Sequence, residues 1–325
     1  MIVVTGGAGF IGSAIVWALN QKGIDDIIIV DSLKKTDKWK NLRSLKYADY
    51  IEKEDFLYFL DKDLLPSNIS KIIHMGACSS TWEDDASYLS QNNFTFTKIL
   101  AEYCIENSIR FLYASSAATY GMGEKGFDDD ITKLQELRPL NMYGYSKQMF
   151  DMYSKKHNYF DKIVGLKFFN VFGPNEYHKG NMTSKMYKSF FEINDTKKIQ
   201  LFKSDHPEWK DGDFVRDFVY IKDVVKIVLE ILENPNVNGL FNIGTAKSRS
   251  WNDLANAMFK SMDIAPNIEY IDMFDHLKGK YQYFTEANMN TLKTACIDIE
   301  CMSLEDSIKD YVKNYLIPNK YLGDE

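Results

Sequence analysis

The start of the chain places a glycine-rich turn between a short apolar run and a helical pattern. Residues 2–5 predict a buried strand, and residues 13–22 predict an amphipathic helix. Gly6, Gly9 and Gly12 lie between them. Gly6 permits a tight turn, Gly9 lets the backbone approach a pyrophosphate, and Gly12 lets the helix pack closely on the strand. This order of strand, turn and helix predicts a dinucleotide-binding α/β fold.

The next apolar run supports the same interpretation. Residues 27–30 predict a second strand, and Asp31 follows it directly. An acid at this position usually holds the adenosine ribose of a dinucleotide. The alternative is a flexible glycine loop between two elements, and the combination of the turn with Asp31 favours the cofactor site.

Further apolar runs alternate with helical patterns along the chain. Residues 69–75, 110–114 and 163–169 predict strands, and residues 87–107 and 143–157 predict helices. Strands that are apolar throughout and alternate with helices form parallel sheets covered on both faces. We therefore predict an α/β fold with a doubly wound parallel sheet.

No linker rich in proline, glycine or serine divides the chain, so we expect two interleaved lobes. The larger, dinucleotide-binding domain takes residues 1–174, 213–244 and 287–325. A smaller substrate-binding lobe takes residues 175–212 and 245–286.

The composition of the chain argues against several classes of function. The 325 residues carry a net charge of −7, which argues against nucleic-acid and anionic-membrane partners. The sequence has no export leader and no apolar run of membrane-spanning length, so we expect a cytoplasmic protein. Its four cysteines and five histidines form no metal-like cluster, and we expect neither a metal nor a disulfide. Cys78 is more simply a packed residue near a cofactor than a catalytic thiol.

Tyr143 and Lys147 are four residues apart at the start of a predicted helix, so they share one helical face. An ammonium one turn away lowers the cost of forming a phenolate, and the phenol can then transfer protons. Ser116 follows the strand at 110–114, at the edge of the sheet where ligands bind. A chance pairing on an unrelated helix is the alternative, and the glycine turn and Ser116 favour a catalytic role.

The Gly-x-x-Gly-x-x-Gly spacing resembles that of the extended short-chain dehydrogenase/reductase superfamily. The His74 to Ala77 turn is similar to the turn with which that superfamily approaches the cofactor, and Ser116 matches its hydroxyl-binding serine. Five local strings are more specific and resemble the ADP-glyceromanno-heptose 6-epimerases. These strings are residues 49–56, 76–81, 177–182, 216–220 and 277–282.

This resemblance implies an isomerase that interconverts ADP-D-glycero- and ADP-L-glycero-β-D-manno-heptose at C6, through a transient 6-keto intermediate and bound NADP. The product supplies the heptose of the lipopolysaccharide inner core. The family forms homo-oligomers, typically homopentamers. Cofactor contacts are implied for Gly6, Gly9, Phe10, Ile11, Gly12, Asp31, Ser32, Lys38, Lys53, Met75, Gly76, Ala77, Cys78, Ser79, Asn92, Lys147, Val171 and Lys179.

Substrate contacts implied by the resemblance involve Ser116, Asn170, Asn181, Lys188, Phe202, Lys203, Ser204, Asp205, Arg216 and Tyr281. We expect Arg216 to hold the ADP pyrophosphate, because a guanidinium meets phosphate oxygens with two donors. A surface salt bridge with Asp213 or Asp217 is the alternative.

A reaction at both faces of C6 calls for two acid/base groups. We expect Tyr143 and Lys179 each to serve one stereoisomer, with Lys147 orienting the nicotinamide ribose and Ser116 holding the C6 oxygen. A solvent-facing loop lysine is the alternative for Lys179.

The choice between NADP and NAD is open from the residues themselves. Asp31 repels a 2′-phosphate and favours NAD, whereas Lys38 and Lys53, with Lys34 and Lys35, can neutralise that phosphate. The resemblance favours NADP, with NAD the less favoured alternative.

The sequence also allows other interpretations of the function. Trp82 and the sequence at 202–205 depart from the family pattern, and residues 206–210 lengthen the loop before Arg216. Another nucleotide-sugar 4-epimerase or 4,6-dehydratase is the nearest competitor, although Ala117-Ala118-Thr119 stands where a dehydratase usually has an acid pair. A silent NADP-sensing protein would not need Ser116, Tyr143 and Lys147 together.

Overall fold

The computed structural model describes residues 1–275 and 281–325. Within these ranges a sheet of parallel strands has the order β10-β6-β5-β4-β1-β2-β3. The predicted parallel sheet is therefore confirmed. Its strands are β1 (Ile2–Thr5), β2 (Ile27–Asp31), β3 (Asp49–Glu52), β4 (Lys71–His74), β5 (Arg110–Ser116), β6 (Val164–Phe168) and β10 (Gly239–Ile243).

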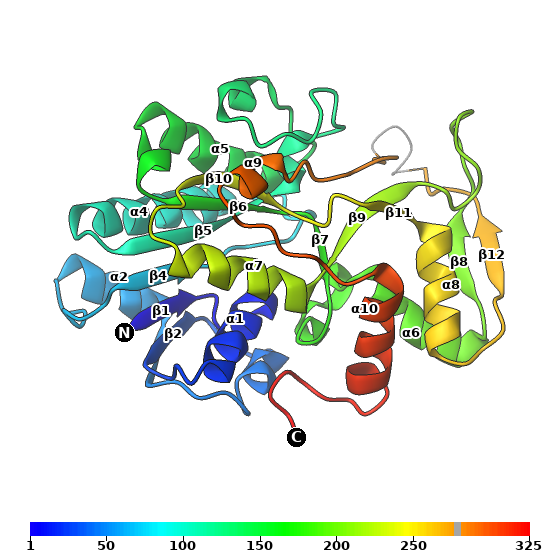
Figure 1. Ribbon diagram of the computed structural model, residues 1–325, viewed down its shortest axis with the longest axis horizontal. Coiled ribbons are helices and arrows are strands. Elements are labelled where there is room, and N and C mark those ends of the chain that lie inside the picture. Colours follow the sequence, from blue (N-terminus) through cyan, green and yellow to red (C-terminus); the bar gives the residue numbers. More distant parts are fainter. Residues whose placement is uncertain (276–280) are drawn as a thin grey trace.

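Helices cover both faces of this sheet (Figure 1). One face carries α1 (Phe10–Gln21) and α7 (Ile221–Glu233), and the other carries α2 (Lys53–Asp61), α4 (Phe96–Glu106) and α5 (Met142–Lys156). Successive strand residues point to opposite faces. Val4 accordingly packs with the α1 and α7 side chains, whereas Val3 packs with those of α2, α4 and α5.

The strand order reverses beside β1, which lies between β2 and β4. In doubly wound sheets the crevice outside the carboxyl ends of the strands at such a point binds ligands. The glycine turn after β1 and the residues after β2, β4 and β5 therefore meet at one edge.

A second group of elements lies at one end of the molecule (Figure 1). It includes a three-stranded sheet of order β11-β9-β7 and a parallel pair, β12-β8. These strands are β7 (Asn170–Phe172), β8 (Ile199–Phe202), β9 (Val215–Tyr220), β11 (Ser248–Ser250) and β12 (Ile268–Ile271), and they accompany α6 (Lys185–Thr196) and α8 (Trp251–Ser261).

The C-terminal helix α10 (Leu304–Tyr311) was expected to return to the first lobe. It packs against both β9 and α8, so it contacts the predicted substrate lobe as well. The division into two lobes stays a prediction.

Shorter helical segments connect these elements. They are the α-helices α3 (Ala86–Leu89) and α9 (Asn290–Thr294), the π-helices η2 (Ser90–Thr95) and η7 (Val312–Leu316), and the 3₁₀ segments η1 (Asp37–Asn41), η3 (Ala117–Tyr120), η4 (Ile131–Glu136), η5 (Tyr159–Asp161) and η6 (Tyr177–Met182).

The predicted helix at 87–107 is divided by the π-helix η2. A π-helix widens the hydrogen-bond ladder and is frequent at functional sites. Here it presents Asn93, whose amide accepts from the backbone N–H of Cys78 at 2.8 Å and donates to the carbonyl of Cys78 at 2.9 Å. The widened turn thus fixes the segment that follows β4.

Candidate active site

The glycine turn has the geometry that the sequence predicts. Gly6 has a φ of 65°, and the N–H of Gly9 donates to the carbonyl of Gly6 at 2.9 Å. A Cβ on Gly12 would lie 2.1 Å from that carbonyl oxygen, so only glycine fits. Gly9 begins α1 without a side-chain cap. The first N–H groups of α1, at Phe10 and Ile11, therefore form a suitable cradle for phosphate.

Asp31 is buried, and its carboxylate already accepts three hydrogen bonds. The donors are the N–H of Ala8 at 2.9 Å, the N–H of Ser32 at 2.7 Å and Nζ of Lys38 at 2.8 Å. A carboxylate offers about four acceptor positions. Asp31 thus keeps room for a ribose hydroxyl, while Lys38 balances its charge.

Asn41, at the end of η1, joins three parts of the site. Its Nδ2 donates to the carbonyl of Ala8 at 2.9 Å and to the carbonyl of Asn175 at 3.1 Å, and it contacts Nδ1 of His178. Its Oδ1 is buried and makes no hydrogen bond within the described residues. A buried acceptor without a hydrogen-bond partner is rare in protein interiors. Oδ1 of Asn41 therefore fits a site in which a bound ligand donates a hydrogen bond to it.

The turn after β4 lies directly against the glycine turn. The N–H of Gly76 donates to Oγ1 of Thr5 at 3.2 Å, and a Cβ on Gly6 would lie 2.7 Å from the nitrogen of Gly76. Met75 packs against the core, and the predicted contacts Ala77 to Ser79 follow in the same turn. Lys53 reaches this edge from the start of α2, where its Nζ donates to Oδ1 of Asn92 at 2.5 Å.

Tyr143 and Ser116 meet across the edge of the sheet. The Ser116 side chain opposes the rise in the pKa of Tyr143 that burial causes. Asn141 caps α5, since its Oδ1 accepts from the N–H of Gly144 at 2.8 Å. The cap fixes the helix start and so the direction of the phenol.

Lys147 lies one turn further along α5 and is 4% exposed. Its Nζ donates to the carbonyl of Ala114 at 2.9 Å. Burial lowers the pKa of Lys147 to about 8, and the Asp151 carboxylate opposes that change. Ser116, Tyr143 and Lys147 therefore lie at the carboxyl end of β5 and the start of α5, and their catalytic roles stay a prediction.

Lys179 lies in η6, and its Nζ stands 5.6 Å from the ring centre of Phe10 at the start of α1. It is half-buried, so it is not a fully solvent-facing lysine. Burial lowers the pKa of Lys179, and Glu176 opposes that change. Within the described ranges no carboxylate forms an ion pair with its ammonium.

Glu176 fixes the segment that carries Lys179. Its buried carboxylate accepts from the hydroxyl of Ser184 at 2.7 Å, the hydroxyl of Tyr311 at 3.0 Å and the N–H of Gly173 at 3.2 Å. The N–H of Ser184 donates to it as well. The Lys179 segment is therefore tied to α6 and α10.

Arg216 on β9 is 6% exposed and faces aromatic rings. Its guanidinium carbon lies 5.1 Å from the ring centre of Tyr281 and 5.8 Å from that of Trp251. It donates to the carbonyls of Val215 and Gln282. Within residues 1–275 and 281–325 it pairs with no carboxylate, which leaves a positive charge suited to a phosphate.

The expected alternative for Arg216, a surface salt bridge, is wrong. Asp217 is fully buried and accepts from the N–H groups of Thr245, Ala246 and Ala287. Asp213 accepts from Nδ2 of Asn252.

Other predicted substrate residues lie around the second group of elements. Nζ of Lys188 donates to the carbonyl of Asn181 at 2.6 Å, and Phe202 packs edge-on against Tyr281 with ring centres 5.9 Å apart. Asn170 is exposed at the start of β7, and Val171 packs against the core.

The side chains of residues 203–205 have partners of their own within the protein. Lys203 forms an exposed ion pair with Asp272, and Asp205 accepts from the hydroxyl of Tyr283 at 3.0 Å. Ser204 donates to the carbonyl of His206. Substrate contacts here stay predictions, and the string at 277–282 is described only at Tyr281 and Gln282.

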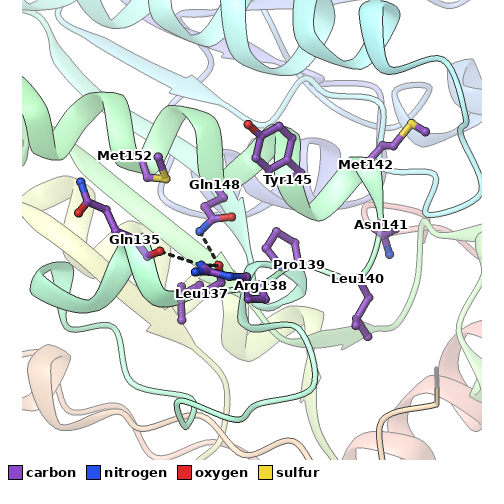
Figure 2. A pocket seen from close by; sticks show the side chains of 10 residues that line it. All are labelled: Gln135, Leu137, Arg138, Pro139, Leu140, Asn141, Met142, Tyr145, Gln148 and Met152. Atoms are coloured by element: carbon purple, nitrogen blue, oxygen red, sulfur yellow. Dashed lines mark hydrogen bonds between the residues drawn. The ribbon is translucent and has the colours of Figure 1, made fainter. Parts of the chain in front are cut away.

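A separate cavity of about 560 Å³ lies on another side of α5 (Figure 2). It is lined by Gln135, Leu137, Arg138, Pro139, Leu140, Asn141, Met142, Tyr145, Gln148 and Met152. Tyr143, Lys147 and Ser116 do not line it, so this cavity is distinct from the predicted catalytic groups.

No helix of the described residues has both the length and the apolar character to cross a membrane. In the same ranges no three His, Cys, Asp or Glu side chains are arranged to hold a metal. All four cysteines are free thiols.

The sheet, the glycine turn and the Ser116, Tyr143 and Lys147 cluster define a class of nucleotide-dependent epimerases and dehydratases. Residues 2–244 match the model of the NAD dependent epimerase/dehydratase family, which assigns a nicotinamide cofactor to this chain.

More similar relatives narrow this class. The chain is 51% identical to the ADP-L-glycero-D-manno-heptose-6-epimerase of Nitratidesulfovibrio vulgaris, over 97% of this chain and 98% of the relative. It is 49% identical to the enzyme of the same name from Fusobacterium nucleatum, over 97% and 98%. The crystal structure of the Helicobacter pylori ADP-L-glycero-D-manno-heptose-6-epimerase superposes with a TM-score of 0.81, at 26% identity over 96% and 95%. The chain belongs to the ADP-L-glycero-D-manno-heptose-6-epimerase family, and the resemblance found in the sequence is confirmed.

Sequence reasoning missed several residues of the site. Asp151 lies four residues after Lys147 on the same helix, and Lys167 interrupts an apolar strand; both patterns were visible signals. The sequence around Asn41 and Glu176 gave no such signal, because their contacts come from segments far apart in the chain.

Proposed function

We propose that this protein interconverts ADP-D-glycero- and ADP-L-glycero-β-D-manno-heptose by inverting C6. The names of its relatives support the substrate. The observation that carries the chemistry is that Tyr143 lies beside Ser116, whose side chain opposes the rise in its pKa, and one helical turn from the buried ammonium of Lys147. A carbinol carbon without an acidic proton is more easily inverted through a ketone than by deprotonation.

A bound nicotinamide nucleotide supplies reversible oxidation of the C6 carbinol. The residues present fit such a group. The glycine turn and the start of α1 provide backbone donors for its phosphates, and Asn41 offers a buried, unpaired acceptor. Lys147 and Lys53 supply positive charge along the same edge of the sheet.

Tyr143 moves the proton at one face of the substrate. Its oxygen accepts the proton of the C6 hydroxyl during oxidation, while Oγ of Ser116 donates to the C6 oxygen and holds it in place. In this proposal the Lys147 ammonium, one helical turn away on α5, stabilises the phenolate, which offsets the cost of ionising a half-buried tyrosine.

Lys179 serves the opposite face of C6 in this proposal. One side chain fixed by a helix start cannot reach both faces of a carbon. Burial lowers the pKa of the Lys179 amine, which makes its neutral, proton-accepting form easier to reach. Its position above Phe10 keeps it beside the glycine turn.

The test replaces each group in turn and assays each epimer separately. Positioned acid/base groups contribute about 10²- to 10⁴-fold to a rate, so Tyr143→Phe and Lys179→Met should each lose that much with one epimer as substrate. Tyr145→Phe is a matched control, because Tyr145 lies two residues further along α5 and is 56% exposed. If both variants keep near-normal turnover with both epimers, the two-base proposal is wrong.

We propose NADP as the resident cofactor, with NAD the alternative. The pairing of Lys38 with Asp31 supports NADP, because it removes the net negative charge that a 2′-phosphate would otherwise meet. Denaturing the purified protein and weighing the released nucleotide tests this choice, and the release of NAD would contradict it.

The resemblance further supports a cytoplasmic homo-oligomer, with a homopentamer as the specific proposal. Light scattering on the purified protein measures the mass directly. A monomer at micromolar concentration would contradict it.

A further inference from the structure

A buried ion pair lies behind the catalytic edge. Oδ2 of Asp151, on α5, is 3.0 Å from Nζ of Lys167, on β6, and both side chains are 0% exposed. Removing two charges from water is costly, so a fully buried pair is weak as a source of stability. The other hydrogen bonds of Asp151 and Lys167 indicate a second role for the pair.

On one side the pair fastens α5 to β5. The Asp151 carboxylate accepts from the hydroxyl of Tyr113 at 2.8 Å and from the hydroxyl of Ser115 at 2.8 Å. One turn earlier in α5, Lys147 donates to the carbonyl of Ala114. Three successive residues of β5 are therefore bound to the helix that carries Tyr143.

On the other side the pair reaches Ser116 itself. Nζ of Lys167 donates to Oγ1 of Thr119 at 2.6 Å, and Oγ1 of Thr119 donates to the carbonyl of Ser116 at 2.8 Å. The ammonium also lies 4.8 Å from the ring centre of Tyr120. Ser116 is thus held through Ser115 on one side and through Thr119 on the other.

We propose that Asp151 and Lys167 are positioning residues that hold the Ser116 hydroxyl in register with Tyr143 and Lys147. Asp151 acts through Ser115, and Lys167 acts through Thr119. The inference rests on the proposed function, because it assumes that Ser116 holds the reacting oxygen.

Removing the Lys167 ammonium takes away the ion-pair partner of the buried Asp151 carboxylate and releases Thr119. A displacement of Ser116 by a fraction of an ångström reduces the reaction rate much more than it reduces substrate affinity, since the nucleotide part of the substrate binds elsewhere. Thr119→Val makes a smaller change, because it removes the link to Ser116 and leaves the ion pair in place.

The experiment compares Lys167→Met, Thr119→Val and the double variant. We expect kcat to fall about 10- to 100-fold in Lys167→Met and Thr119→Val, with KM within about threefold of the wild-type value. The double variant should lose no more than Lys167→Met, because both changes break one path. Hydrogen exchange of the holoenzyme should be faster in the peptide that spans residues 115–120 in each variant.

A folded Thr119→Val protein with unchanged kcat and exchange would overturn the inference, as would additive losses in the double variant. If Lys167→Met does not fold, Thr119→Val alone decides. Failure of the proposed function would look different, because wild-type protein would then not invert C6 or Tyr143→Phe would remain active.

Discussion

The ammonium nitrogen of Lys38 lies 2.8 Å from Oδ1 of Asp31, at the carboxyl end of β2. Lys38 is 25% exposed and also donates to the carbonyl of Ser32 at 3.1 Å, so the loop after β2 closes back on the strand. Asp31, the acid whose position after β2 favours NAD, is thereby neutralised by a lysine of the loop that follows it.

Lys38→Ala should lower the affinity for NADP and leave that for NAD nearly unchanged. A charge-assisted hydrogen bond contributes about 1.5 to 3 kcal/mol, which corresponds to about 10- to 100-fold in Kd. Calorimetric titration of the protein freed of nucleotide measures both values. Lys40→Ala is the matched control, since Lys40 pairs with Asp37 at the surface of the same segment. Equal losses for the two nucleotides would contradict a role in recognising the 2′-phosphate.

Arg216→Met should raise KM for ADP-heptose about 10- to 100-fold, because the variant lacks the buried guanidinium proposed to bind the pyrophosphate. Steady-state kinetics with varied substrate measures the change, and the content of bound nicotinamide nucleotide should stay at the wild-type level. Arg249→Met is the control. Arg249 is the direct cross-strand neighbour of Arg216 but pairs with Glu305 and Asp253. A KM that changes equally in the two variants would remove Arg216 from the substrate site.

The ionisation of Lys147 should appear in the dependence of stability on pH. Its pKa is about 8 in the folded protein, against 10.5 for an ordinary lysine, so the unfolded chain binds more protons between these values. The free energy of unfolding of the wild type, relative to that of Lys147→Met, should therefore rise between pH 8 and pH 10.5 by up to about 3 kcal/mol.

Urea unfolding at several pH values measures this difference. Lys156→Met, at the exposed end of the same helix, is the matched control. A flat difference for Lys147→Met would mean that Lys147 keeps an ordinary pKa in the folded protein.

Glu176→Gln should lower the free energy of unfolding by about 1 to 3 kcal/mol. The amide –NH₂ of the variant would face N–H and O–H groups that donate to the Glu176 carboxylate in the wild type. Chemical denaturation measures the loss. Glu230→Gln, on the exposed face of α7, should remain within about 0.5 kcal/mol of the wild type. Wild-type stability of Glu176→Gln would show that these hydrogen bonds are readily replaced by an amide.

Local patterns in the sequence predict much of this fold. The strand at residues 2–5 and the helix that begins near Tyr143 match β1 and α5, because both depend on apolar periodicity and turn chemistry within a few residues. The predicted helix at 87–107 missed its π-helical part. That widening depends on the contact of Asn93 with Cys78, which periodicity does not report.

The site was predictable only where its parts are close in sequence or match a family motif. The spacing of Tyr143 and Lys147 identified one helical face, and their approach to Ser116 follows from the sheet order. The contact of Asp151 with Lys167 and that of Glu176 with Tyr311 depend on which buried segments meet. Single-sequence patterns contain no information on such pairings.

The single amide of Asn41 spans the two ends of this site, as it grips the glycine turn at Ala8 and the approach to Lys179 at Asn175. A displacement of the glycine turn would therefore be transmitted through Asn41 to the segment that carries Lys179. By thermodynamic reciprocity, a ligand that displaced the Lys179 segment would in turn change the affinity for a ligand bound at the glycine turn.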